Sequence, residues 1–335
     1  MTNPITTSTG SDASVRPTSP RRKIISVIIP VFNEENNIRR AYAEVCRVFD
    51  ELDRYDLEIV FTDNHSTDLT PKILAEIASA DQRVKVIRFA RNFGFQNSVL
   101  TGYRIASGEA AFQLDCDLQD PPSAFPSFLN LWESGHDVVV GVRRKRMESR
   151  FIQLGRKIYY RLIQKFSDDN LMPDGGDFRL IDRSVLDELR RIHDAFPYTR
   201  GLTSSLAKRQ VGVHIDRDRR IYDESKFRLR GMLSLAMDGF FAHSLLPLRL
   251  ATYFGFIMAV GLFLLAAGYA IAKVLIGSDW PTGFASLAVL VAFGASLNAI
   301  FIGITGEYVG RIYSQIRQRP NTITEYTINL NADSR

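Results

Sequence analysis

Cysteine and tryptophan are scarce in this sequence, with two of each among 335 residues. Cys46 and Cys116 stand alone, without the close pairs that mark zinc sites or redox motifs, and they fit a reducing compartment. The first 20 residues are rich in Ser, Thr and Pro and have no apolar core. We therefore expect residues 1–22 to be a disordered segment and not a signal peptide. The 45% share of hydrophobic residues excludes disorder for the chain as a whole.

Charge is absent from two long stretches, residues 251–272 and 281–306. Each stretch is long enough for a helix to cross a bilayer core of roughly 30 Å, at about 1.5 Å per residue. A buried helical hairpin of a soluble protein is the alternative, and two successive charge-free runs argue against it. These runs predict a two-helix transmembrane domain over 249–310.

Lys and Arg are also missing from the loop 274–280 between these runs, whereas Arg311, Arg317 and Arg319 follow the second run. The positive-inside rule then predicts that both ends of the membrane domain face the cytoplasm. We expect a multi-pass protein of the plasma (inner) membrane, with a cytoplasmic N-terminal domain over 23–228 and a cytoplasmic tail over 311–335.

Short β-rich runs and amphipathic helical runs alternate along the N-terminal half. This alternation predicts an α/β fold with a doubly wound, mostly parallel sheet. The expected strands are 23–30, 57–62, 84–89 and 110–114, and the expected helices are 36–52, 70–80 and 96–107.

An acidic cluster, Asp115-Cys-Asp-Leu-Gln-Asp-Pro-Pro122, follows the last of these strands. Its carboxylate and amide oxygens suit a hard cation such as Mg²⁺ or Mn²⁺, although a solvated surface turn is the alternative. Polar residues also follow the first two strands, at 33–34 and 63–64. Because ligands bind at the carboxyl ends of parallel strands, the three clusters together predict a nucleotide site.

Several motifs carry a family resemblance: Val27-Ile-Ile-Pro-Val-Phe-Asn-Glu-Glu35, Thr62-Asp-Asn-His-Ser-Thr-Asp68, Arg91-Asn-Phe-Gly94, the acidic cluster and Gly175-Gly-Asp-Phe-Arg-Leu180. With Asp223-Glu-Ser-Lys226 and the two apolar runs, the chain resembles GT-A-fold family 2 glycosyltransferases of the polyprenyl-phosphate (dolichol-phosphate mannose synthase) type. It is most similar to the bacterial undecaprenyl-phosphate glucosyltransferases. The resemblance covers residues 24–320 and implies a Rossmann-like GT-A domain.

The resemblance also implies roles for individual residues. The nucleotide-sugar ligands would be Pro30, Phe32, Glu34, Asp63, Asn64, Asp115, Arg143, Arg220 and Lys226. The metal ligands would be Asp117 and Gln119, holding Mg²⁺ or Mn²⁺. The catalytic residues would be Asp115, Asp117, Asp177 and Arg179, with Asp177 acting as a base or as an orienter of Arg179 and the acceptor.

The sequence departs from the family at one motif, where Asp-Asp-Gly-Ser is replaced by Asp63-Asn64-His65-Ser66. Asn64 can accept from a uracil N3–H through its carbonyl, but its amide can also donate to a base, so the base stays open. His65 is either a turn residue, which we favour, or a catalytic base.

The implied reaction moves glucose from UDP-glucose to undecaprenyl phosphate with inversion at the anomeric carbon. Aminoarabinose, N-acetylhexosamine or mannose donors are alternatives. A polysaccharide synthase would need a Gln-x-x-Arg-Trp element, which neither Trp132 nor Trp280 provides; a membrane transporter or scaffold would leave the acidic motif unexplained.

The membrane contributes a further set of expectations. Interfacial helices are predicted near 150–166 and over 229–248, because basic residues flank an apolar stripe in the first and apolar residues recur in the second; core packing is the alternative for the first. A homo-oligomer, a tetramer by resemblance, is expected, and a nucleic-acid partner is not.

Overall fold

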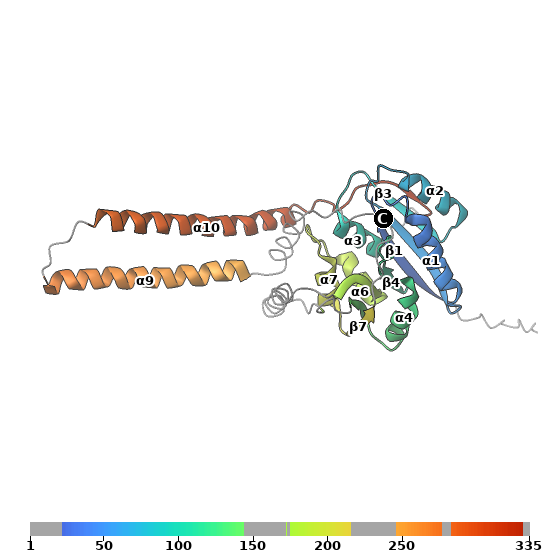
Figure 1. Cartoon of the computed structure of the whole chain (residues 1–335), viewed down its shortest axis with the longest axis horizontal. Coiled ribbons are helices and arrows are strands. Elements are labelled where there is room, and N and C mark those ends of the chain that lie inside the picture. The colour runs from blue at the N-terminus through green and yellow to red at the C-terminus, as the bar shows by residue number, and fades with distance from the viewer. Residues whose placement is uncertain (1–21, 144–171, 173–174, 216–245, 277–282, 331–335) are drawn as a thin grey trace, which may run out of the picture.

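A computed structural model describes residues 22–143, 172, 175–215, 246–276 and 283–330. These residues form an α/β domain and two long helices that project from it side by side (Figure 1). The predicted disordered segment, both predicted interfacial helices, Arg220 and Lys226 fall wholly or almost wholly outside the described residues.

The α/β domain is built on one eight-stranded sheet with the strand order β7-β5-β6-β4-β1-β2-β3-β8. The strands are β1 (Lys23–Val31), β2 (Tyr55–Asp63), β3 (Val84–Phe89), β4 (Ala110–Gln113), β5 (Val138–Arg143), β6 (Gly175–Asp182), β7 (Gln210–Ile215) and β8 (Thr324–Ile328). The helices are α1 (Ile38–Asp50), α2 (Thr70–Ala80), α3 (Phe95–Ile105), α4 (Phe125–Glu133), α6 (Arg183–Arg191), α7 (Thr199–Leu206), α9 (Leu246–Ile276) and α10 (Phe284–Ile316), with a short 3₁₀ turn at Pro122–Ala124.

Four neighbouring strands, β4, β1, β2 and β3, run parallel and form the centre of the sheet. The side chains of β1 are buried on both faces from Ile25 to Val31, because helices cover both sides. One face packs against α1, α2 and α4, and the other against α3 and α6. The predicted α/β class and its first seven elements are confirmed.

A cluster of phenylalanines supports the strand that leads to the acidic turn. Phe112 of β4 stacks on Phe125 of α4 with ring centroids 4.1 Å apart, and Phe128 lies 4.8 Å from Phe178 of β6. All four rings are fully buried. Burying each ring contributes about 1.5–3 kcal/mol, so the start of the acidic turn is held by a rigid core.

Strand β8 was not predicted from the sequence. It pairs antiparallel with β3 and closes that edge of the sheet, which brings the end of the described chain back beside β3 (Figure 1). Residues just before β8 also touch the α/β domain: the Asn321 side chain donates to the Asp194 carbonyl at 2.7 Å, and Ala90 N donates to Ile323 O at 2.8 Å.

Helix α9 contains the first charge-free run, and α10 contains residues 284–306 of the second. Among the residues that the structure describes, no helix combines the length and the apolarity needed to cross a membrane.

Candidate active site

The acidic turn after β4 alternates between open and buried side chains. Asp115, Asp117 and Gln119 are partly exposed, whereas Cys116 and Leu118 between them are buried. Leu118 adopts a φ of +53°, which is unusual for a branched side chain and lets the turn reverse this sharply. The alternation therefore leaves three oxygen-bearing side chains of the turn partly exposed.

This donor set fits a hard divalent cation. No group of three or more His, Cys, Asp or Glu residues arranged for a metal ion occurs in the described part of the chain. The partly exposed residues of the turn nevertheless include two carboxylates and one amide oxygen, and Mg²⁺ is commonly held by one or two carboxylates together with substrate phosphates.

Residues around Asp115 and Asp117 restrict how these side chains lie. Gln113 Nε2 donates to Asp115 Oδ1 at 2.9 Å, and the backbone N–H of Gln119 donates to Asp117 Oδ1 at 3.1 Å. Burial raises the pKa of the Cys116 thiol well above its usual value, and the nearby carboxylates of Glu34, Asp117 and Asp115 raise it further. Glu34, after β1, therefore lies close to the acidic turn, as predicted from the parallel strands.

Asp63 ends β2 and is fully buried. Its Oδ1 accepts from the backbone N–H of Ser66 at 2.9 Å, and its Oδ2 accepts from Arg88 Nη1 at 2.5 Å. Each carboxylate oxygen has two lone pairs, so these two contacts do not use all the acceptor capacity of Asp63, although its side chain is enclosed by the protein.

Asn64 points into the protein and not toward open space. Its Oδ1 accepts from the backbone N–H of Phe93 at 2.8 Å, and its Nδ2 donates to Asn92 Oδ1 at 2.9 Å. Both ends of the amide thus hold the Arg91–Gly94 loop against β2. The next residue, His65, has a φ of +66°, a left-handed value typical of turns, and its Nδ1 lies 3.1 Å from the Phe89 carbonyl oxygen. Both features fit a turn residue, the role favoured for His65 from the sequence.

Asp177 and Arg179 lie on β6 and face α7. Arg200, in the first turn of α7, donates through Nε to Asp177 Oδ1 at 2.7 Å and through Nη2 to Asp177 Oδ2. This is the two-pronged contact that a guanidinium makes with a carboxylate. Asp177 and Asp115 also both lie near the buried Tyr103, whose pKa is raised chiefly by burial.

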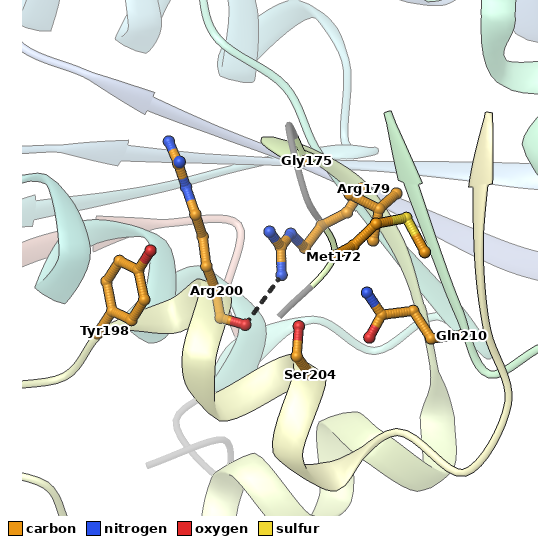
Figure 2. Close-up of a pocket in the computed structure, with 8 residues that line it drawn as sticks. Met172, Gly175, Arg179, Tyr198, Arg200, Ser204 and Gln210 are labelled. Atoms are coloured by element: carbon orange, nitrogen blue, oxygen red, sulfur yellow. Dashed lines mark hydrogen bonds between the residues drawn. The ribbon is translucent and has the colours of Figure 1, made fainter. Parts of the chain in front are cut away.

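Arg179 is buried beneath a small pocket between β6 and α7 (Figure 2). It donates to Thr203 Oγ1, to the Gly176 carbonyl at 2.8 Å and to the Arg200 carbonyl at 3.5 Å. Burial lowers the pKa of Arg179. Its contacts tie α7 to β6, which fixes the position of Arg200 beside Asp177. The pocket is lined by Val140, Met172, Gly175, Arg179, Tyr198, Arg200, Ser204 and Gln210.

The remaining predicted ligands are less closely grouped within the described residues. Pro30 lies within β1, Phe32 just after it has an exposed fraction of 40%, and Arg143 ends β5. The sequence did not predict a role for Arg88 or Arg200 in the site. Their roles depend on contacts across the sheet and between β6 and α7, which no local spacing in the sequence reveals.

Comparison with known proteins defines the class of enzyme. Residues 26–190 match the profile of glycosyl transferase family 2. An uncharacterized glycosyltransferase of Bacillus subtilis, YkcC, is 37% identical to this chain, over 91% of it and 94% of the relative. The chain belongs to glycosyl transferase family 2 and is a glycosyltransferase with a GT-A-like, mostly parallel sheet.

More specific names occur among the relatives. The SfII prophage-derived bactoprenol glucosyl transferase of Shigella flexneri is 35% identical, over 89% of this chain and 96% of the relative. Among solved structures, glucosyl-3-phosphoglycerate synthase from Mycobacterium tuberculosis, in complex with Mn²⁺, UDP and phosphoglyceric acid, is 18% identical. It covers 64% of this chain and 75% of its own, with a TM-score of 0.45.

Proposed function

We propose that the protein transfers glucose from UDP-glucose to a polyprenyl phosphate such as undecaprenyl phosphate, with inversion, at the cytoplasmic face of the plasma membrane. The observation that carries the proposal is the edge of the sheet where Glu34, Asp63 and the acidic turn follow three neighbouring parallel strands. Similarity to a bactoprenol glucosyl transferase along nearly its whole length supports the acceptor and the sugar.

The nucleotide would bind across the carboxyl ends of β1, β2 and β4. The base would bind beside Asp63 at the end of β2, and the partly exposed side chains of Asp117 and Gln119 suit a Mg²⁺ or Mn²⁺ ion beside the diphosphate. When bound, such an ion would supply positive charge that stabilises the departing nucleoside diphosphate. Asp115 is held by Gln113 at the same edge, where it can orient the sugar and its phosphate.

The chemical step requires little acid–base catalysis, because a lipid phosphate is already an anionic nucleophile. The main difficulty is to bring two polyanions together, and fixed cationic side chains reduce it electrostatically. Arg200 lies in the β6–α7 pocket with its guanidinium on Asp177. Asp177 then orients this cation near the acceptor, which favours its role as an orienter over that of a strong base.

Helices α9 and α10 are proposed to anchor this site to the membrane. Large apolar side chains point outward from both helices; the exposed fraction is 71% for Phe256, 77% for Leu275 and 65% for Ile302. Such exposure is unfavourable in water and suits lipid tails. A tetramer remains a proposal that rests on the family resemblance alone.

The test is a transfer assay with the full-length protein in detergent, undecaprenyl phosphate, Mg²⁺ or Mn²⁺, and a panel of labelled nucleotide sugars. We expect lipid-linked glucose from UDP-glucose. Transfer only from an aminoarabinose, N-acetylhexosamine or mannose donor would refute the choice of sugar, and no lipid-linked product with any donor would refute the reaction.

A single substitution tests the metal-binding turn. Asp117→Ala should lower turnover by about 100-fold or more, because it removes a proposed ligand of the cation that stabilises the leaving group. Asp56→Ala is the matched control, since Asp56 is exposed on β2 outside the site. Equal turnover of the Asp117→Ala variant and the wild type would rule out the metal role.

A further inference from the structure

Arg88 connects the buried carboxylate Asp63 to the C-terminal strand β8. Asp63 of β2 and Arg88 of β3 are register partners in adjacent parallel strands, so their side chains leave the same face of the sheet. Arg88 Nη1 donates to Asp63 Oδ2 at 2.5 Å and to the Ser66 carbonyl at 3.1 Å, while Nε donates to Glu325 Oε2 at 2.9 Å. The guanidinium is thus held by acceptors on β8, at the end of β2 and in the loop that follows it.

A bulge in β8 brings Glu325 to Arg88. The register pairs Phe89 with Thr324 and Arg88 with Tyr326, so Glu325 is an extra residue in β8 between the two pairs. In a regular ladder Glu325 would pair with Phe89 and point to the face opposite Arg88. Bulges turn a side chain in this way and are common next to active sites.

From this geometry we propose that Arg88 and Glu325 are positioning residues for Asp63, so that β8 completes the nucleotide site. The inference rests on the proposed binding of a nucleotide at Asp63. A buried carboxylate is costly without a cation, and Arg88 is the cation that the structure places on it. Glu325 restrains that cation, and through it the position of the buried Asp63 carboxylate at the end of β2, where the nucleotide is proposed to bind.

An effect on the position of Asp63 can be measured separately from an effect on protein stability, because the ion pair between Arg88 and Glu325 lies near the surface. The Glu325 side chain is 45% exposed, whereas that of Arg88 is 13% exposed and that of Asp63 is fully buried. Exposed ion pairs contribute little to folding. Loss of Glu325 should therefore leave the fold intact while Arg88 and Asp63 gain freedom.

The experiment measures UDP and GDP binding by calorimetry on the full-length protein in detergent, with no requirement for turnover. Glu325→Gln should weaken binding of the preferred nucleotide about fivefold, which is about 1 kcal/mol at 1.4 kcal/mol per factor of ten. Where turnover is measurable, KM for the nucleotide sugar should rise by the same factor, with kcat and the acceptor KM unchanged. Glu76→Gln is the matched control, because it breaks an exposed surface pair with Arg39 that joins α1 and α2 and involves neither Arg88 nor β8.

A second variant tests whether Glu325 acts through Arg88. Arg88→Gln should weaken nucleotide binding more than Glu325→Gln does, and the double variant should be no weaker than Arg88→Gln alone. Additive losses, or unchanged affinity in Glu325→Gln, would overturn the positioning role and leave the proposed reaction standing. Absence of UDP and GDP binding in the wild type would overturn the inference together with the proposed nucleotide site, whereas binding without any lipid-linked product would refute only the reaction.

Discussion

The pair formed by Asp177 and Arg200 gives the sharpest prediction about catalysis. Arg200 contacts both carboxylate oxygens of Asp177, and the two side chains are only 31% and 16% exposed. Arg200→Gln keeps a similar length but removes the charge and the two-pronged geometry. Asp177 then keeps its negative charge beside the proposed acceptor phosphate, where it repels the nucleophile.

The size of the effect follows from the partial burial of the pair. Removing one partner of a buried, hydrogen-bonded charge pair costs about 2–5 kcal/mol. Because Arg200 is about one-third exposed, solvent screening places the cost near the lower end, at about 2–3 kcal/mol. A loss of this size in transition-state stabilisation lowers kcat/KM by about 30- to 150-fold.

The assay is the transfer of glucose to undecaprenyl phosphate at varied acceptor concentration. The loss should be largest in kcat/KM for the acceptor, while affinity for the nucleotide stays within about twofold, since Arg200 contacts β6, which β4 and β1 separate from the β2 strand that carries Asp63. Arg200→Lys should recover only part of the activity, because an ammonium group cannot reproduce the guanidinium fork. The exposed pair of Arg191 with Glu188 provides the control variant Arg191→Gln. Wild-type kcat/KM in Arg200→Gln would refute the reasoning.

Two further predictions concern stability. Hydrogen bonds from Lys85 and Ser107 to the buried Glu58 outweigh desolvation and lower its pKa in the folded state, so its stabilisation is present above the unfolded pKa and is lost as pH falls through the lower folded value. Glu58→Gln should lower the free energy of unfolding by about 2–4 kcal/mol at pH 7. In urea unfolding, the difference in this free energy between wild type and variant should become smaller below about pH 4.5. A difference that does not change with pH would contradict this prediction. Asn64→Asp replaces the amide donor with a carboxylate oxygen that faces the acceptor Asn92 Oδ1, so the free energy of unfolding should fall by about 1–3 kcal/mol. An unchanged melting temperature would show that the Asn64 amide does not hold this loop.

The central strands and helices could be predicted from the sequence because their signals are local. The run from Lys23 to Val31 is apolar and β-branched, and Thr70–Ala80 begins with a proline suited to a first helical turn. Polar residues directly after parallel strands also predicted that Glu34 and the acidic turn would meet, since strand direction alone fixes that edge.

The rest depends on contacts between distant parts of the chain. Glu325 lies 237 residues from Arg88 in the sequence, and β8 is a short strand that gains its partner only from the folded sheet. Asn64 was assigned to the nucleotide by its place in a motif. Its amide engages Asn92 and Phe93 in the folded chain, and that can be known only once the Arg91–Gly94 loop is placed beside β2.

The return of β8 to the sheet also has a consequence for how the protein is made. Translation runs from the N-terminus, so β1 to β7 leave the ribosome before α9 and α10, and β8 is synthesised after both. Until then the β3 edge lacks this partner strand, and an open edge can pair with another chain. Enzyme molecules interrupted between α10 and β8 would keep most of the α/β domain but would leave the β3 edge without this partner strand.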